Sequence, residues 1–317
     1  MKNPADKQHK PRYSGVWSAA PTPFDEGLAV DVDSVKRMVE HHHRLGVMGL
    51  FLAGTNGEGP WLPERELRTL VRTVVKANRG RMTIAVQVTD NSAARIVDNI
   101  GRAADDGADL AVIAPPYFGM SYASPRETER RLEALYLEAV DGSPLPVGIY
   151  DRGTYSAVVI PERVLARVYL EPKVRVVKDS SVIASHLVLA IKAREKRPEL
   201  ALFCGYEFDC VKYLRAGYDG LLLGGGVFNG GLANSILKAM ADGDEQAAEA
   251  YQARMNRLMY TVYGGKKIKA WLSGEKYLLV KLGLFRTYRN FPDYPLTERE
   301  KAAIDKIIER EKSFLLP

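Results

Sequence analysis

The sequence has few of the features that mark secreted, membrane-spanning and redox proteins. Only two of its 317 residues are cysteines, Cys204 and Cys210, and they do not form a C-x-x-C pair. The lysine- and proline-rich residues 1–12 contain no apolar core, so they do not resemble a signal peptide. No apolar run approaches the ~20 residues that a membrane-spanning helix needs. We therefore expect a soluble, cytoplasmic protein with reduced cysteines and no membrane partner.

Motifs for nucleic-acid, dinucleotide and metal binding are also missing. The net charge of +6 is spread along the chain and forms no basic stripe with interleaved aromatic residues, so we expect no nucleic-acid partner. No G-x-G-x-x-G follows the first apolar run. His41, His42 and His43 are consecutive on a predicted helix and point in different directions, so they cannot converge on one ion. We expect neither a metal nor a cofactor.

Eight short apolar runs alternate with helical patterns along the chain. The runs predict strands at 15–20, 48–53, 82–88, 109–114, 146–150, 174–178, 200–204 and 220–223. Eight alternations favour an α/β fold of the (β/α)8 TIM-barrel type over an open doubly wound sheet, which commonly has five or six strands. In such a barrel the functional residues lie at the carboxyl ends of the strands.

The predicted domain organisation has three parts. Residues 1–12 are expected to form a disordered basic tail, residues 13–242 the catalytic barrel, and residues 243–317 a C-terminal helical domain. The first barrel helix is predicted to begin with Asp33 as its N-cap and to stop at Gly46. Helical patterns near the C-terminus occupy 232–241, 244–260, 275–283 and 297–313, of which the first completes the barrel.

Lys178 ends the β-branched run 174–178, which is typical of a strand buried on both faces. Close to Val176 and Val177, its ammonium group would lose solvation, which lowers the pKa and increases the neutral amine available near pH 7. That is the requirement for a lysine that forms a Schiff base. The alternative is a lysine that extends its charge from the strand end into solvent.

Other strand ends carry further candidate groups. The glycine-flanked turn 54–59 can bind a carboxylate through its amides, or can be a turn without chemistry. Tyr150 can relay protons, or can simply fill the strand end. Tyr117 and Phe118 can line a pocket or a subunit contact. The glycines 224–226 can bind phosphate or allow close helix packing.

Three of these motifs occur together and in order: Gly-Thr-Asn-Gly-Glu at 54–58, Tyr150 and Lys178-Asp179. In this combination the chain beyond its tail resembles the dihydrodipicolinate synthase/N-acetylneuraminate lyase family of class I aldolases. The resemblance implies that Lys178 forms an imine with pyruvate or a related 2-keto acid and that Tyr150 relays protons. It also implies that the turn at Thr55 and Asn56 binds the substrate carboxylate, and that the protein is a homotetramer built from dimers.

The sequence departs from the dihydrodipicolinate branch at three places. That branch has Thr-Thr in place of Thr55-Asn56, a tyrosine pair in place of Tyr117-Phe118, and an arginine in place of Tyr155. The motifs are more similar to the 4-hydroxy-2-oxoglutarate aldolase and sugar-acid branches. We therefore expect Tyr155 to contact a neutral, hydroxylated part of the substrate. Arg152, three residues earlier, is not expected to replace the missing arginine.

These observations predict a Schiff-base-forming lyase that cleaves, condenses or dehydrates a 4-hydroxy- or 3-deoxy-2-keto acid. One alternative is 4-hydroxy-tetrahydrodipicolinate synthase of lysine biosynthesis. The other is a non-catalytic barrel that only binds a keto acid. The presence of both Tyr150 and Lys178 favours an enzyme, because a binding module does not need a buried amine nucleophile.

Overall fold

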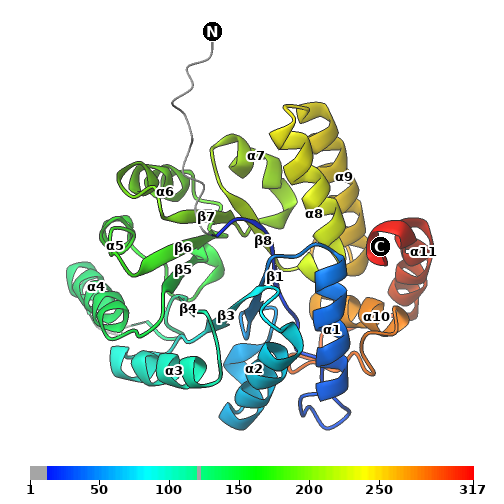
Figure 1. Ribbon diagram of the computed structural model, residues 1–317, viewed down its shortest axis with the longest axis horizontal. Coiled ribbons are helices and arrows are strands. Elements are labelled where there is room, and N and C mark those ends of the chain that lie inside the picture. The colour runs from blue at the N-terminus through cyan, green and yellow to red at the C-terminus, as the bar shows by residue number, and fades with distance from the viewer. Residues whose placement is uncertain (1–12, 120–122) are drawn as a thin grey trace.

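The computed structural model describes residues 13–119 and 123–317, so the expected tail at 1–12 lies outside the described residues. Eight parallel strands close into a barrel in chain order, surrounded by helices (Figure 1). The strands are β1 (Gly15–Ala19), β2 (Gly49–Leu52), β3 (Thr83–Gln87), β4 (Leu110–Ile113), β5 (Val147–Asp151), β6 (Val174–Asp179), β7 (Ala201–Cys204) and β8 (Gly220–Leu223). Every predicted strand overlaps an observed one, which confirms the (β/α)8 barrel.

From Val176 onward, side chains of β6 alternate between the barrel interior and the layer beneath the helices: Val176 belongs to the interior cluster, and Val177 packs into the core between sheet and helices. Val174 lies on the same side as Val177, because the pairing of β5 and β6 shifts register between Val147 and Gly148. Lys178 follows Val176 on the inner side and pairs in register with Tyr150 of β5. The period of two therefore brings both predicted catalytic side chains to the same end of the barrel.

A helix follows each strand, as the alternating pattern predicts. These helices are α1 (Val32–Arg44), α2 (Glu64–Asn78), α3 (Ala93–Asp105), α4 (Pro125–Asp141), α5 (Glu162–Val168), α6 (Ala184–Lys196), α7 (Cys210–Arg215) and α8 (Gly226–Ala241). The prediction that Asp33 caps α1 is wrong. Asp31 accepts hydrogen bonds from the amides of Asp33 and Ser34 (3.1 and 3.3 Å), because the helix begins at Val32.

The last barrel helix, α8, also begins earlier than predicted, at Gly226 rather than at residue 232. Glycines made this stretch look like a loop, but close packing requires them. A Cβ atom on Gly226 would lie 2.7 Å from the Cβ atom of Ser18 on β1. The helix therefore starts where it touches the barrel wall, and its low helix propensity is overridden by this packing.

Three helices follow the barrel: α9 (Glu245–Val262), α10 (Trp271–Lys281) and α11 (Glu298–Leu315). Figure 1 shows α9 alongside α8, and α11 on the outside of this group. The division into a barrel at 13–242 and a helical domain at 243–317 stays a prediction. Among the described residues, no helix combines the length and the hydropathy that crossing a bilayer requires.

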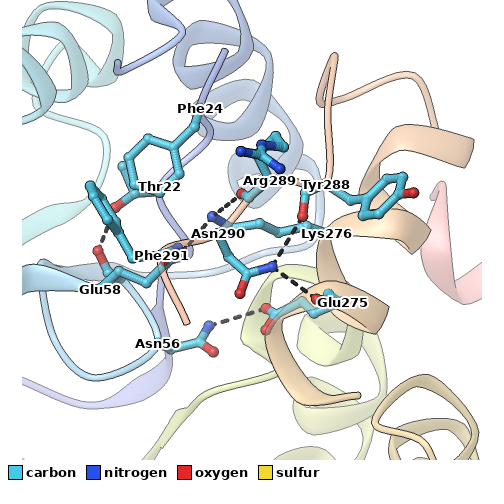
Figure 2. A network of polar contacts seen from close by, with 12 residues as sticks. Thr22, Phe24, Asn56, Glu58, Glu275, Lys276, Tyr288, Arg289, Asn290 and Phe291 are labelled. Atoms are coloured by element: carbon cyan, nitrogen blue, oxygen red, sulfur yellow. Dashed lines mark hydrogen bonds and ion pairs between the residues drawn. The ribbon is translucent and has the colours of Figure 1, made fainter. Parts of the chain in front are cut away.

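A buried ion pair joins α10 to the loop after β2. Lys276 and Glu58 are both completely buried, and the Lys276 ammonium donates to Oε1 of Glu58 and to the carbonyl of Arg289 (3.0 Å). The second oxygen of Glu58 accepts from the amide of Phe291 at 2.7 Å. Figure 2 shows how these groups converge from segments more than 200 positions apart in sequence.

Replacing Lys276 by methionine should destabilise the protein by about 3–5 kcal/mol, because Glu58 would be left buried without its cation. The measurement is the free energy of unfolding from urea titration. The double variant Lys276→Met/Glu58→Gln should lose less than the single variant, since no charge remains unpaired.

Lys281→Met provides the matched control on the same helix. Lys281 is partly exposed and lies 3.4 Å from Asp305, so its loss should cost less than about 1 kcal/mol. Equal unfolding free energies for Lys276→Met and Lys281→Met would contradict the importance of the buried pair.

Candidate active site

A cavity of about 440 Å³ opens at the carboxyl ends of the strands. It lies where α/β barrels place their functional residues. Its walls come from the ends of β1, β2, β5, β6, β7 and β8 and from the segment between α9 and α10. All five predicted site residues line it: Thr55, Asn56, Tyr150, Tyr155 and Lys178.

Lys178 lies almost fully buried in this cavity, with 4% of its surface exposed. Its Nζ atom is 4.2 Å from the centre of the Tyr150 ring and 5.0 Å from that of Phe51. Among the described residues no carboxylate forms an ion pair with it. Burial lowers the pKa of Lys178, and the neighbouring Tyr150 and Glu207 oppose this shift only in part. The group is therefore closer to the neutral, nucleophilic form than an exposed lysine.

Room for Lys178 is provided by Gly205, just after β7. A Cβ atom at this position would lie 2.9 Å from Cε of Lys178 and 2.2 Å from Oγ of Ser180. Any other residue would therefore displace the lysine chain or the serine. The absence of a side chain at Gly205 keeps the amine in its place above Tyr150.

Tyr150 faces the same cavity and is 7% exposed. Burial alone raises the pKa of its phenol, but the positive charges of Lys178 and Arg152, aided by the hydroxyl groups of Thr55 and Ser180, outweigh burial and lower it. A phenol with a lowered pKa next to an amine can both donate and accept a proton.

The residues that follow the two catalytic candidates anchor the strand ends. Asp151, after Tyr150, accepts from His186 (2.6 Å). Asp179, after Lys178, accepts from the hydroxyls of Tyr218 (2.8 Å) and Ser181 (2.7 Å). These outward-pointing carboxylates fix the strand ends on the helix side of the sheet. The inward-pointing Tyr150 and Lys178 are fixed with them.

The turn after β2 brings Thr55 and Asn56 to the cavity wall. The Asn56 side chain is 3% exposed, and its amide donates to the carbonyls of Ala19 (2.9 Å) and Gly224 (3.0 Å) and to Glu275 (3.1 Å). This amide is therefore part of the frame around the cavity. The Thr55 hydroxyl and the turn backbone remain the groups available to a substrate carboxylate.

Glu207, just after β7, is a site residue that the sequence analysis missed. It lines the cavity and accepts hydrogen bonds from the Gly225 amide (2.7 Å) and the Tyr263 hydroxyl (3.0 Å). Burial raises the pKa of Glu207, and these hydrogen bonds oppose the shift only in part. Because Glu207 accepts from the Gly225 amide, this amide is not free for a phosphate, which weakens the phosphate-binding interpretation of 224–226.

The cavity also contains cations and aromatic rings that were not predicted. Arg152 lines it, and the described residues offer this guanidinium no acidic partner. The expectation that Arg152 does not replace the missing arginine stays a prediction. The α9–α10 segment adds Lys266 at the mouth. The aromatic residues are Tyr206, Phe208, Tyr260, Tyr263 and Trp271, which join Tyr150 and Tyr155. No local pattern marked them, because they are separated along the chain.

Phe118 and Tyr117 lie outside this cavity. Phe118 is 75% exposed, and Tyr117 accepts a hydrogen bond from Gln87 (3.3 Å) beside a second cavity between α2 and α3. Within the single chain neither aromatic ring reaches Lys178. Phe118 is exposed enough to take part in a subunit contact.

His41 and His42 of α1 and the two cysteines are buried and serve packing, whereas His43 is exposed. His41 bonds to the Val227 carbonyl (2.9 Å), and His42 bonds to Met38 and Ser18. Burial lowers the pKa of His41 to about 4 and that of His42 to about 3. Residues 13–119 and 123–317 contain no group of three His, Cys, Asp or Glu side chains arranged to hold a metal ion. Both cysteines are buried and free.

The chain is similar in sequence to two kinds of enzyme over most of its length. The chain is 30% identical over 301 residues to 4-hydroxy-tetrahydrodipicolinate synthase from Jannaschia sp. (strain CCS1), covering 92% of this chain and 96% of the relative. It is 25% identical to N-acetylneuraminate lyase 2 from Escherichia coli O6:H1 (strain CFT073), covering 94% of each.

A solved structure of dihydrodipicolinate synthase from Bacteroides thetaiotaomicron superposes with a TM-score of 0.83 at 26% identity, covering 95% of this chain and 99% of that one. The model of the dihydrodipicolinate synthetase family matches residues 12–311, which include every strand of the barrel and the cavity described above. A match of this extent leaves no competing assignment for the barrel, and the chain belongs to the dihydrodipicolinate synthetase family.

Proposed function

We propose that the protein cleaves or dehydrates a 4-hydroxy- or 3-deoxy-2-keto acid, with Lys178 as nucleophile and Tyr150 as proton relay. Family membership makes the chain a Schiff-base-forming lyase of the class I aldolase type that acts on pyruvate or a related 2-keto acid. The observation that carries the residue assignment is the buried amine of Lys178, which lies over Tyr150 without a carboxylate partner among the described residues.

In the proposed reaction the Lys178 amine adds to the keto carbon, and the keto oxygen leaves as water with protons relayed through Tyr150. The imine nitrogen is protonated and withdraws electrons from the neighbouring carbons. Tyr150 then takes the proton of the 4-hydroxyl as the bond between C3 and C4 breaks, which leaves an enamine and releases an aldehyde. Protonation of the enamine at C3 and addition of water return the free lysine and release pyruvate.

The cavity walls support a partner that is neutral and partly apolar. Tyr155 occupies the wall, and the rings of Phe208 and Tyr260 stack with centroids 5.0 Å apart beside it. Aromatic side chains bury the apolar C–H faces of a hydroxylated chain, while their hydroxyls bind its polar groups. These features favour the tail of a sugar acid as the leaving aldehyde.

One observation favours the alternative function, 4-hydroxy-tetrahydrodipicolinate synthase. Arg152 lines the cavity without an acidic partner among the described residues, and a guanidinium can grip the carboxylate of an incoming aldehyde. Several relatives also carry this name. The family resemblance further supports a homotetramer in the cytoplasm, and both remain proposals.

The first prediction concerns the nucleophile. Sodium borohydride together with pyruvate should add a pyruvate-derived mass to Lys178 alone, read by peptide mass spectrometry, because Lys178 is the only lysine among the described residues that is buried in the cavity. Lys178→Ala should lower the rate by several orders of magnitude and keep the fold. An adduct on Lys266, or no adduct, would contradict the mechanism.

The second prediction concerns the proton relay. Tyr150→Phe should lower kcat at least ~10²-fold, because a general acid–base group contributes that much. Phe118→Tyr should change kcat little, since Phe118 lies outside the cavity. The measurement is kcat of both variants from steady-state kinetics. Near-normal turnover by Tyr150→Phe would show that Tyr150 is not the proton relay.

The third prediction separates the two reactions. Cleavage of a 4-hydroxy- or 3-deoxy-2-keto acid that releases an uncharged aldehyde should have a higher kcat/KM than condensation of pyruvate with aspartate semialdehyde. Without a cation for its carboxylate, the semialdehyde would lose roughly 10- to 150-fold in affinity.

The variant Arg152→Met tests whether Arg152 supplies that cation. On the proposed function it should lower kcat/KM only modestly for the keto acid that releases an uncharged aldehyde. If the condensation is faster and Arg152→Met abolishes it, the protein is the synthase and our interpretation of Tyr155 is wrong.

A further inference from the structure

The turn that carries Thr55 and Asn56 has a strained backbone. Ala53 and Glu58, at its two ends, both adopt left-handed conformations with φ of +53° and +58°. A Cβ atom on Gly59 would lie 1.8 Å from the Ala53 carbonyl oxygen, so the chain is also tightly folded on itself. Such conformations persist only where the surrounding structure holds them. The turn therefore depends on contacts from outside.

Those contacts come from two consecutive residues of α10. Glu275 accepts a hydrogen bond from the Asn56 amide (3.1 Å), and Lys276 donates to the carboxylate of Glu58. Between these two points the Gly57 carbonyl accepts from the Thr22 hydroxyl (2.6 Å). Figure 2 shows Asn56 and Glu58 facing the two α10 side chains from the same stretch of loop. One helix thus restrains the turn at two positions.

Glu275 acts in this contact as a hydrogen-bond acceptor. It is completely buried, and burial, strengthened by the nearby charges of Glu207 and Glu58, raises its pKa well above the usual range despite the attraction of Lys276. Its Oε2 atom has no hydrogen-bond partner among the described residues. A glutamine at this position would preserve both the shape and the acceptor, whereas a leucine would preserve only the volume.

We propose that Glu275 and Lys276 are positioning residues, which hold Asn56 and Glu58 so that the Thr55–Asn56 turn is preformed to bind the substrate carboxylate. The inference rests on the proposed function, because it assigns carboxylate binding to this turn. Asn56 lines the cavity, whereas neither α10 residue does. Loss of the restraint should therefore weaken recognition of the carboxylate and leave the chemistry of the Lys178 amine intact.

The test compares two ketones that differ only in the group the turn is proposed to bind. Pyruvate and hydroxyacetone both present a ketone to Lys178, but only pyruvate carries a carboxylate. Borohydride trapping of Lys178 is measured against the concentration of each. Glu275→Leu should raise the half-saturating concentration of pyruvate about 3- to 10-fold, as expected for one lost hydrogen bond, and leave that of hydroxyacetone unchanged. Glu275→Gln should remain within about twofold of wild type for both.

The controls distinguish a failure of the proposed function from a failure of the positioning role. Lys281→Met, on the exposed part of α10, should leave both trapping curves unchanged. If wild type is not trapped on Lys178 by pyruvate, the proposed function fails. If wild type is trapped but Glu275→Leu shows no change, or weakens both ketones equally, the positioning role is wrong. Should Glu275→Leu not fold, Glu275→Asp, which withdraws the acceptor by one methylene, must give the same split between the ketones.

Discussion

Lys178 is held inside the barrel without a carboxylate at ion-pair distance among the described residues, and the rest of the site is arranged around that condition. The nearest acidic group in its cavity, Glu207, is bonded to the Gly225 amide and the Tyr263 hydroxyl. If Glu207 were free to turn toward Lys178, the pair would hold the proton on the amine and raise its pKa. These two hydrogen bonds therefore keep Glu207 from pairing with Lys178 and raising the pKa of its amine. One of them comes from Tyr263, at the end of α9.

The register between β5 and β6 places the two reacting side chains next to each other. Tyr150 and Lys178 are neighbours across β5 and β6 and point inward, while Asp151 and Asp179 are neighbours that point outward. The outward pair is bonded to His186 and Tyr218 from the helix side. Because successive residues of a strand alternate in direction, one set of contacts fixes the backbone and the next residue performs the chemistry. A shift of one residue in register would exchange the two sets.

This alternation explains why much of the fold and the two central site residues could be predicted from the sequence. Apolar runs marked every strand, and the strand ends placed Tyr150 and Lys178 together. Arg152, Glu207 and Trp271 could not be found in this way, because their position in the cavity depends on loops that carry no period. Asp31 rather than Asp33 caps α1 for a related reason: both are good caps, and only the packing of the preceding loop selects between them.

The least predictable part of the site is the contribution of the C-terminal helices. Glu58 and Lys276 are 218 positions apart, and nothing in either local sequence indicates that they form a pair. A hydrophobic pair of equal volume could stabilise the contact as well as these charges do. It would not, however, direct the two oxygens of Glu58, one to Lys276 and the other to the Phe291 amide. We infer that the polar contact is retained for geometry, since a strained turn that must present Thr55 to a small anion needs its end fixed in direction as well as in distance.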